Sequence, residues 1–141
     1  MSQDGALIML GGDGTPIQFE RRHRDFLLLT IFVLANQHKF DEAAELAEGL
    51  MGFAENDKEA IFAAAVLDFA RGHLMRCRER LKVLDEIAPI STKAKKGFVV
   101  QRNRARLYLR ARCAYDLNLT DEADAAIAQY LRAPGIDYDE K

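Results

Sequence analysis

The sequence His38-Lys39-Phe40-Asp41-Glu42-Ala43 combines a polar turn, an apolar residue and a small residue, and this arrangement recurs along the chain. In the first copy, an apolar stripe follows at Ala47 and Leu50 with the spacing of one helical face. A second copy, residues 72–77, lies 34 residues later, and a third, residues 118–123, lies 46 residues after the second. A 34-residue period with helix-turn-helix content predicts stacked helical hairpins, with extra residues inserted before the third copy.

The apolar spacing and the chain breaks predict six helices. The pair Asn56-Asp57 is expected to cap and break the chain before a helix and Gly72 to stop one, and Pro89 and Pro134 interrupt the helical pattern. The expected helices are residues 24–37, 41–53, 58–71, 74–87, a longer one from between 91 and 95 to 117, and 120–132.

Residues 1–20 differ from the rest because glycines and Pro16 exclude a helix there. Residues 7–10 and 17–19 are expected to form short extended pieces. The predicted fold is therefore all-α, with three stacked antiparallel helical hairpins and a non-helical amino-terminal arm. The arm covers residues 1–20, the helical domain 21–135 and an acidic tail 136–141.

Composition limits the class of protein. The chain has 141 residues and a net charge of −2, and its longest apolar run, residues 26–35, is far shorter than the ~20 residues that a membrane helix needs. No basic residue precedes Arg21, and the only cysteines, Cys77 and Cys113, are far apart in the sequence. These features predict a cytoplasmic protein without membrane insertion.

The repeat resembles the tetratricopeptide repeat (TPR) family. That family places a small residue where its two helices cross, which matches Ala43, Cys77 and Ala123. It has an apolar residue shortly before, matching Phe40, Leu74 and Leu119, and it closes the repeat with a proline, matching Pro89 and Pro134. The match is degenerate, because the chain has no Trp and the first copy has Glu55 in place of the proline and Ile31 at the tight helix contact.

The resemblance implies a protein-binding module with a concave groove. A short cytosolic chain of three degenerate repeats looks like the chaperones of bacterial type III secretion, which implies that it holds an amphipathic or hydrophobic segment of a secretion protein. The residues expected to line the groove, with Arg112 pairing an acid of the partner, are Leu28, Phe32, Phe62, Val66, Phe69, Tyr108, Arg112 and Tyr115.

An alternative function rests on charge segregation. Residues 91–112 carry eight bases and no acid, and Arg102, Arg106 and Arg110 are spaced as one stripe, called here the basic stripe. Three interpretations are open: a solvated or internally paired face, a docking site of a regulatory or scaffold adaptor for an acidic protein, and, least favoured, a nucleic-acid site.

Catalysis is not expected. The three histidines are isolated, none has a cysteine or acid at metal-ligand spacing, and both cysteines lie inside helical patterns, so no metal, cofactor or catalytic residue is predicted. Only nine residues follow Arg132, too few for the polar helix that usually closes such arrays. Self-association as a homodimer, or folding together with a partner, is therefore expected. The identity of the partner is open.

Overall fold

The computed structural model describes residues 8–10, 16–18, 21–90 and 97–132. Apart from one short strand pair, these residues form an all-α fold. Strands β1 (Ile8–Leu10) and β2 (Pro16–Gln18) pair antiparallel, with Met9 opposite Ile17. The helices are α1 (Arg21–Asn36), α2 (Phe40–Phe53), α3 (Lys58–Ala70), α4 (Leu74–Ile87), α5 (Gly97–Asp116) and α6 (Thr120–Arg132).

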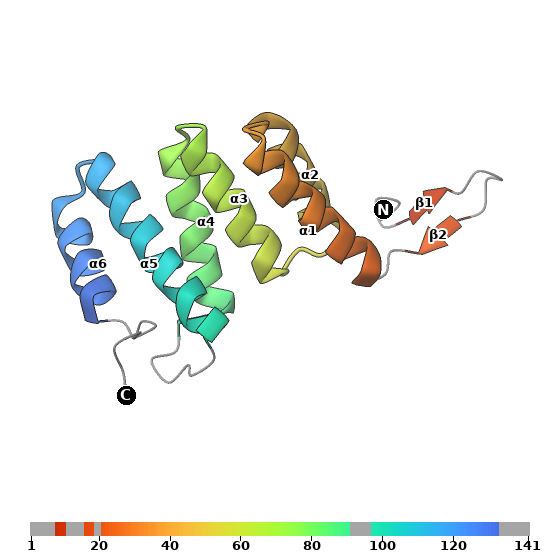
Figure 1. The fold of residues 1–141 in the computed structure, drawn as a ribbon. Helices are drawn as coiled ribbons and strands as arrows, with labels where there is room; N and C mark the ends of the chain where they lie inside the picture. Colours follow the sequence, from red (N-terminus) through yellow and green to blue (C-terminus); the bar gives the residue numbers. More distant parts are fainter. Residues whose placement is uncertain (1–7, 11–15, 19–20, 91–96, 133–141) are drawn as a thin grey trace.

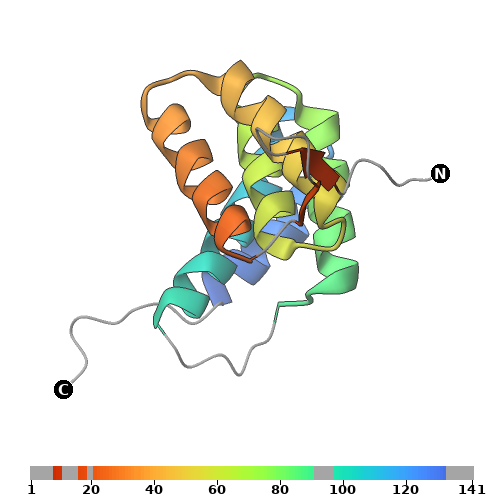
Figure 2. The ribbon, with the colours of Figure 1, turned by 90° about the vertical axis from the view of Figure 1, so that its right-hand side faces the viewer.

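The helices pack as three successive hairpins, α1–α2, α3–α4 and α5–α6. Each hairpin closes through a turn of three residues, so its two helices must lie side by side. The hairpins follow one another in chain order, with α1 and α6 at opposite ends of the row (Figure 1), and the end view shows them one behind another (Figure 2). We call α1, α3 and α5 the leading helices.

The three hairpin turns share one backbone conformation. His38, Gly72 and Asn118, which are equivalent in the repeat, all have positive φ angles of 62°, 83° and 63°. The next backbone N–H in each turn donates to the carbonyl oxygen five residues earlier, which is the Schellman arrangement that satisfies the carbonyl groups at a helix end. These bonds join Lys39 to Leu34 at 2.9 Å, His73 to Asp68 at 2.7 Å and Leu119 to Ala114 at 2.9 Å.

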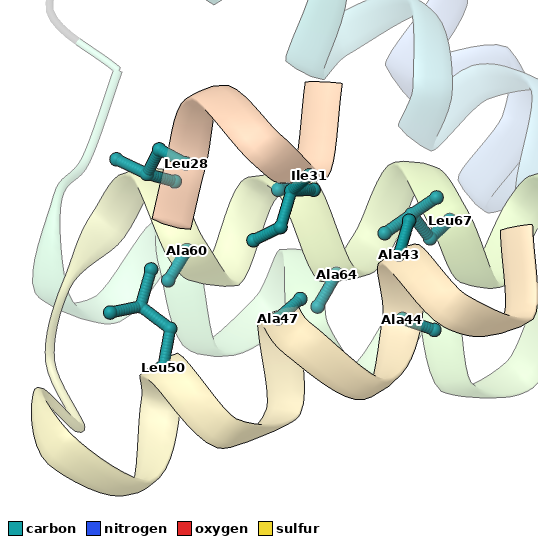
Figure 3. Close-up of a cluster of buried hydrophobic side chains, with 10 residues drawn as sticks. Leu28, Ile31, Ala43, Ala44, Ala47, Leu50, Ala60, Ala64 and Leu67 are labelled. Atoms are coloured by element: carbon teal, nitrogen blue, oxygen red, sulfur yellow. The ribbon is translucent and has the colours of Figure 1, made fainter. Parts of the chain in front are cut away.

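The small residues at the helix crossings are buried as the repeat predicts. Ala43 and Cys77 are fully buried and Ala123 nearly so. Figure 3 shows how the first crossing is built, with Ala43 and Ala47 of α2 facing Ile31 of α1 and the alanines of α3. Small side chains are needed here because they let the helix backbones approach closely.

Helix α3 is covered on almost every side. Asp57 caps it, accepting hydrogen bonds from the N–H groups of Glu59 at 3.0 Å and Ala60 at 3.2 Å. Its buried residues occur all round the helix, and Val66 is its most exposed large apolar side chain. The nearly continuous apolar sequence of this helix therefore follows from its central position between the outer hairpins.

Helix bounds agree with the sequence prediction within three residues, except at the start of α5. This helix begins at Gly97, whereas the predicted start between 91 and 95 falls outside the described residues. The strands agree with the extended pieces predicted near residues 7–10 and 17–19. Residues 133–141, including the predicted acidic tail, also lie outside the described residues.

Candidate functional site

The leading helices present exposed side chains at an equivalent position of the repeat. Phe32, Val66 and Arg112 occupy the same repeat position in α1, α3 and α5, and all three are exposed. Phe32 is 58% exposed and Val66 40%, which is unusual for large apolar residues at matching positions of packed helices. The same position of the repeat is therefore exposed in all three hairpins.

Arg112 joins this surface between α3 and α5. Its guanidinium lies over the Phe69 ring of α3 at 5.4 Å, and one of its nitrogens donates to the Tyr108 hydroxyl at 3.0 Å. Arg112 also lies 3.6 Å from Asp116, one turn further along α5. The pKa of Arg112 is raised above its ordinary value, mainly by its interaction with Tyr108 and to a smaller extent by the charge of Asp116. Arg112 therefore stays cationic amid aromatic rings.

Tyr108 and Tyr115 extend the surface along α5. They are 47% and 68% exposed. Tyr108 also lines an open hollow of about 410 Å³, where its ring lies 6.0 Å from that of Tyr130 on α6. Arg104 stacks on the other ring of this pair, with its guanidinium carbon 4.3 Å from the Tyr130 centroid. The third hairpin thus offers aromatic groups flanked by cations. We define the candidate binding surface as Phe32, Val66, Phe69, Tyr108, Arg112 and Tyr115.

Three residues predicted to line the groove contribute mainly to the core. Leu28 is 7% exposed and packs in the cluster of α1, α2 and α3 shown in Figure 3, so its assignment to an open groove was wrong. Phe62 and Phe69 are half-buried and pack on a second cluster of Ala65, Cys77, Leu81, Leu109 and Cys113. Phe69 still lies beneath the guanidinium of Arg112, whereas Phe62 chiefly supports α3 against its neighbours.

Sequence reasoning missed part of the exposed surface of α1. Phe26, Leu29 and Val33 are 66%, 61% and 44% exposed, and they are spaced along one face of the helix. Periodicity shows that these residues form an apolar face, but it cannot show whether a neighbour covers that face. The signal that could have found them is position, since α1 lies at one end of the described row of hairpins (Figure 1).

The basic stripe is used inside the fold. Arg106 is buried; it donates to the Asp85 carboxylate at 2.7 Å and to the Ala88 carbonyl at 2.8 Å. Arg110 pairs with the same Asp85, and Arg102 lies 3.4 Å from Glu59 of α3. Burial lowers the pKa of Arg106, although the pairing with Asp85 acts in the opposite direction. The stripe therefore fastens α5 to α4 and α3, as in the internally paired interpretation.

Further ion pairs fix the first hairpin against the second. The buried carboxylate of Asp68 accepts from Arg71 at 2.9 Å and from Arg80 at 2.6 Å. Both arginines also reach acids of α2, Arg71 meeting Asp41 and Arg80 meeting Glu48. Acids of α2 are thus connected through two arginines to one buried acid, which sets the relative positions of these helices.

Comparisons with known proteins assign no family: no family model matches the sequence, and neither a curated protein nor a solved structure matches it. Within the described ranges, no group of three or more His, Cys, Asp or Glu side chains could hold a metal ion. No helix in this part of the chain is long and apolar enough to cross a membrane. The surface of the leading helices is therefore the strongest candidate site, and its chemistry suits an apolar ligand with an acidic group.

Proposed function

We propose that this chain is a TPR-like protein-binding module that holds an amphipathic or hydrophobic segment of another protein in a concave groove on its leading helices. The observation that carries the proposal is the exposure of Phe32, Val66 and Arg112 at one repeat position of three successive helices. An apolar helix laid across the leading helices would bury these side chains together with Tyr108 and Tyr115.

The character of the surface favours a protein segment over a small molecule. Aromatic residues and Arg are the groups most enriched at the energetic centres of protein interfaces. Here Arg112 stacks on Phe69 and contacts Tyr108, so it would present its charge within an apolar setting. An acid on the bound helix would pair with Arg112 while its apolar face covers the rings.

The most specific form of the proposal is a cytoplasmic chaperone that masks an aggregation-prone helix of a type III secretion subunit until export. This form rests on the resemblance of the repeats to those chaperones. The exposed aromatic surface is compatible with it, since a holding chaperone must offer apolar area to its client. The module would bind and release the client without chemical change to it.

The adaptor alternative has less support. A docking stripe needs arginines that are free to meet an external acid, but Arg106 is buried and two stripe residues share Asp85. Binding an acidic protein or nucleic acid there would require breaking these pairs. The stripe is better explained as a connection between hairpins.

The experiment is a pull-down with the tagged protein from the source cells. The complexes are washed at low and at high salt, and the bound proteins are identified by mass spectrometry. A small, helix-rich partner that resists high salt is expected because burial of apolar surface does not depend on charge attraction. A partner lost at high salt from the wild-type protein would instead support the adaptor.

A matched pair of variants tests where on the protein the partner segment binds. Val66→Glu introduces a charge in the candidate binding surface, and Val83→Glu introduces the same charge on α4, where Val83 is similarly exposed at 44%. Binding of the captured segment should weaken at least tenfold in Val66→Glu and remain unchanged in Val83→Glu, with circular dichroism showing that both variants fold. Equal binding by the two variants would exclude this surface.

A further inference from the structure

Two buried thiols meet at the junction between the second and third hairpins. The Sγ atom of Cys77 on α4 lies 3.1 Å from the Sγ atom of Cys113 on α5. The two side chains are 0% and 1% exposed, and both are free cysteines. They are 36 residues apart in the sequence, so the fold alone brings them together.

The equivalent position in the first junction holds an unreactive pair. By the repeat offsets of 34 and 46 residues, Cys77 corresponds to Ala43 and Cys113 corresponds to Leu67. Ala43 and Leu67 belong to one buried cluster, and Figure 3 shows them near each other between α2 and α3. A packed apolar pair is therefore sufficient for this contact, and packing alone does not require two cysteines at the second junction.

The second junction is also the one where a crosslink would have most effect. Among consecutive helices, α4 and α5 make the least extensive contact. The Asp85 ion pairs with Arg106 and Arg110 supplement this packing. A covalent bond from Cys77 to Cys113 would join the same two helices and fix the third hairpin on the second.

The surroundings distinguish the two thiols. Cys113 lines a small cavity of about 20 Å³, enough for one water-sized molecule, beside Arg78, Lys82, Arg110 and Glu122. Its pKa is lowered mainly by the hydrogen bond with Cys77, against the effect of burial. That same hydrogen bond raises the pKa of Cys77, and burial acts in the same direction. Because Cys113 borders this cavity and Cys77 is not among its lining residues, Cys113 is the thiol that a small oxidant reaches first.

We propose that Cys77 and Cys113 are a site of reversible disulfide formation, which links the third hairpin to the second when the protein meets a peroxide. The thiolate of Cys113 attacks one peroxide oxygen, the O–O bond breaks, and a sulfenic acid and hydroxide form. The sulfur of Cys77 then attacks the sulfenic sulfur, and its proton leaves with the hydroxyl group as water. The thiols lose two electrons, which the peroxide gains, and a dithiol reductant reverses the change.

The link would fix α5 relative to α3 and α4. Arg112, which precedes Cys113, spans from α5 to Phe69 on α3. Oxidation should therefore reduce the motion of the third hairpin, including Tyr108 and Tyr115. The disulfide site is independent of the proposed binding function, because its evidence is the contact between the two thiols.

The test treats the reduced, folded protein with hydrogen peroxide, then unfolds it in a maleimide reagent and measures the intact mass. The wild-type protein should lose both maleimide adducts after oxidation and regain both after treatment with a dithiol. Tryptic digestion of the oxidised protein should give residues 77–78 linked to residues 113–132. The thermal midpoint of unfolding should rise by about 5 °C or more on oxidation, because the bond closes a long loop of the unfolded chain.

Cys77→Ala is the matched control, since alanine is the natural residue at the equivalent positions 43 and 123. This variant should fold, show no midpoint shift on oxidation, and accumulate a sulfenic acid at Cys113 that a dimedone probe traps. The proposal is overturned if both wild-type thiols still take maleimide after native oxidation. It is equally overturned if the disulfide joins two chains, or if Cys77→Ala shows the same midpoint shift.

Discussion

Asp85 on α4 holds the buried guanidinium of Arg106 on α5, with Oδ1 of Asp85 lying 2.7 Å from a terminal nitrogen of the arginine. The side chain of Arg106 is 7% exposed, whereas that of Asp85 is 34% exposed. The cation is therefore removed from water while its partner stays at the surface. Such an arrangement makes the arginine depend on one carboxylate.

Replacement of this carboxylate should destabilise the fold. In Asp85→Ala the buried charge of Arg106 and the nearby charge of Arg110 both lose the carboxylate that they share, and we expect the free energy of unfolding to fall by about 2–3 kcal/mol. Urea unfolding followed by circular dichroism measures this change. Glu86→Ala, at an exposed position of the same helix, is the control and should change the free energy by less than about 0.5 kcal/mol. Similar effects in both variants would show that Asp85 is not needed to keep Arg106 buried.

The hairpin turns predict a stabilising substitution. His38 has φ 62° at the position where the second hairpin has Gly72. A left-handed conformation strains a residue with a side chain, so His38→Gly should raise the free energy of unfolding by about 0.5–1 kcal/mol. This net gain already includes the loss of the contact between the His38 and Phe40 rings, whose centroids lie 5.3 Å apart.

The reverse change supplies the control for the turns. Gly72→Ala should lower the free energy of unfolding by about 1 kcal/mol, because the same strain is introduced. Gly52 is the comparison, since it is an exposed helical glycine with open space where a Cβ would lie. Gly52→Ala should be neutral or stabilising. If Gly72→Ala is as stable as Gly52→Ala, the left-handed turn does not limit stability.

The lowered pKa of Asp57 in the folded protein predicts how stability depends on pH. Burial alone would raise its pKa, but the hydrogen bonds from Arg24 and from the N–H groups of Ala60 and Glu59 lower the pKa below its ordinary value. The unfolded chain therefore takes up the proton first as the pH falls. The stabilisation that ionised Asp57 gives the fold is complete well above pH ~4. It is lost as the pH falls from there through the lower pKa that Asp57 has in the folded protein.

Asn at this position keeps a cap but cannot ionise. Asp57→Asn should therefore be less stable than wild type at neutral pH and should lose less stability between neutral and acid pH, so that the two curves approach each other in acid. Unfolding in urea at a series of pH values measures both curves. Asp124→Asn, at an exposed position of α6, should follow the wild-type curve. If the free energies of unfolding of Asp57→Asn and wild type differ by the same amount at every pH, the pKa of Asp57 is not lowered in the folded protein.

The exposed face of α1 predicts self-association. Phe26, Leu29 and Val33 are exposed at spacings of three and four residues, the pattern of a helix that packs on a partner. Analytical ultracentrifugation should show a dimer that dissociates on dilution through the micromolar range. Leu29→Gln should weaken this dimer at least tenfold, while Met75→Gln, at a 52% exposed position of α4, should not. A wild-type protein that stays monomeric at high concentration would contradict the prediction.

Much of the fold could be predicted because the relevant signals are local. Asp57, Gly72 and the spacing of Ala43, Ala47 and Leu50 act through contacts within a few residues, and they placed helix ends and buried faces correctly. The exposure of the residues expected to line the groove was predicted less well. Leu28 and Phe32 are one turn apart and both apolar, yet Leu28 is buried and Phe32 is exposed.

The helices, the three equivalent turns and the repeat of small residues follow from the amino-acid sequence, since each depends on backbone hydrogen bonds and side-chain spacing within one hairpin. Three features emerge only when the hairpins pack together: the apolar faces that remain exposed, the burial of Arg106 against Asp85, and the contact of Cys77 with Cys113. These outcomes depend on how one hairpin docks on the next. Docking brings together residues that are distant in sequence, and periodicity within a helix carries no information about them.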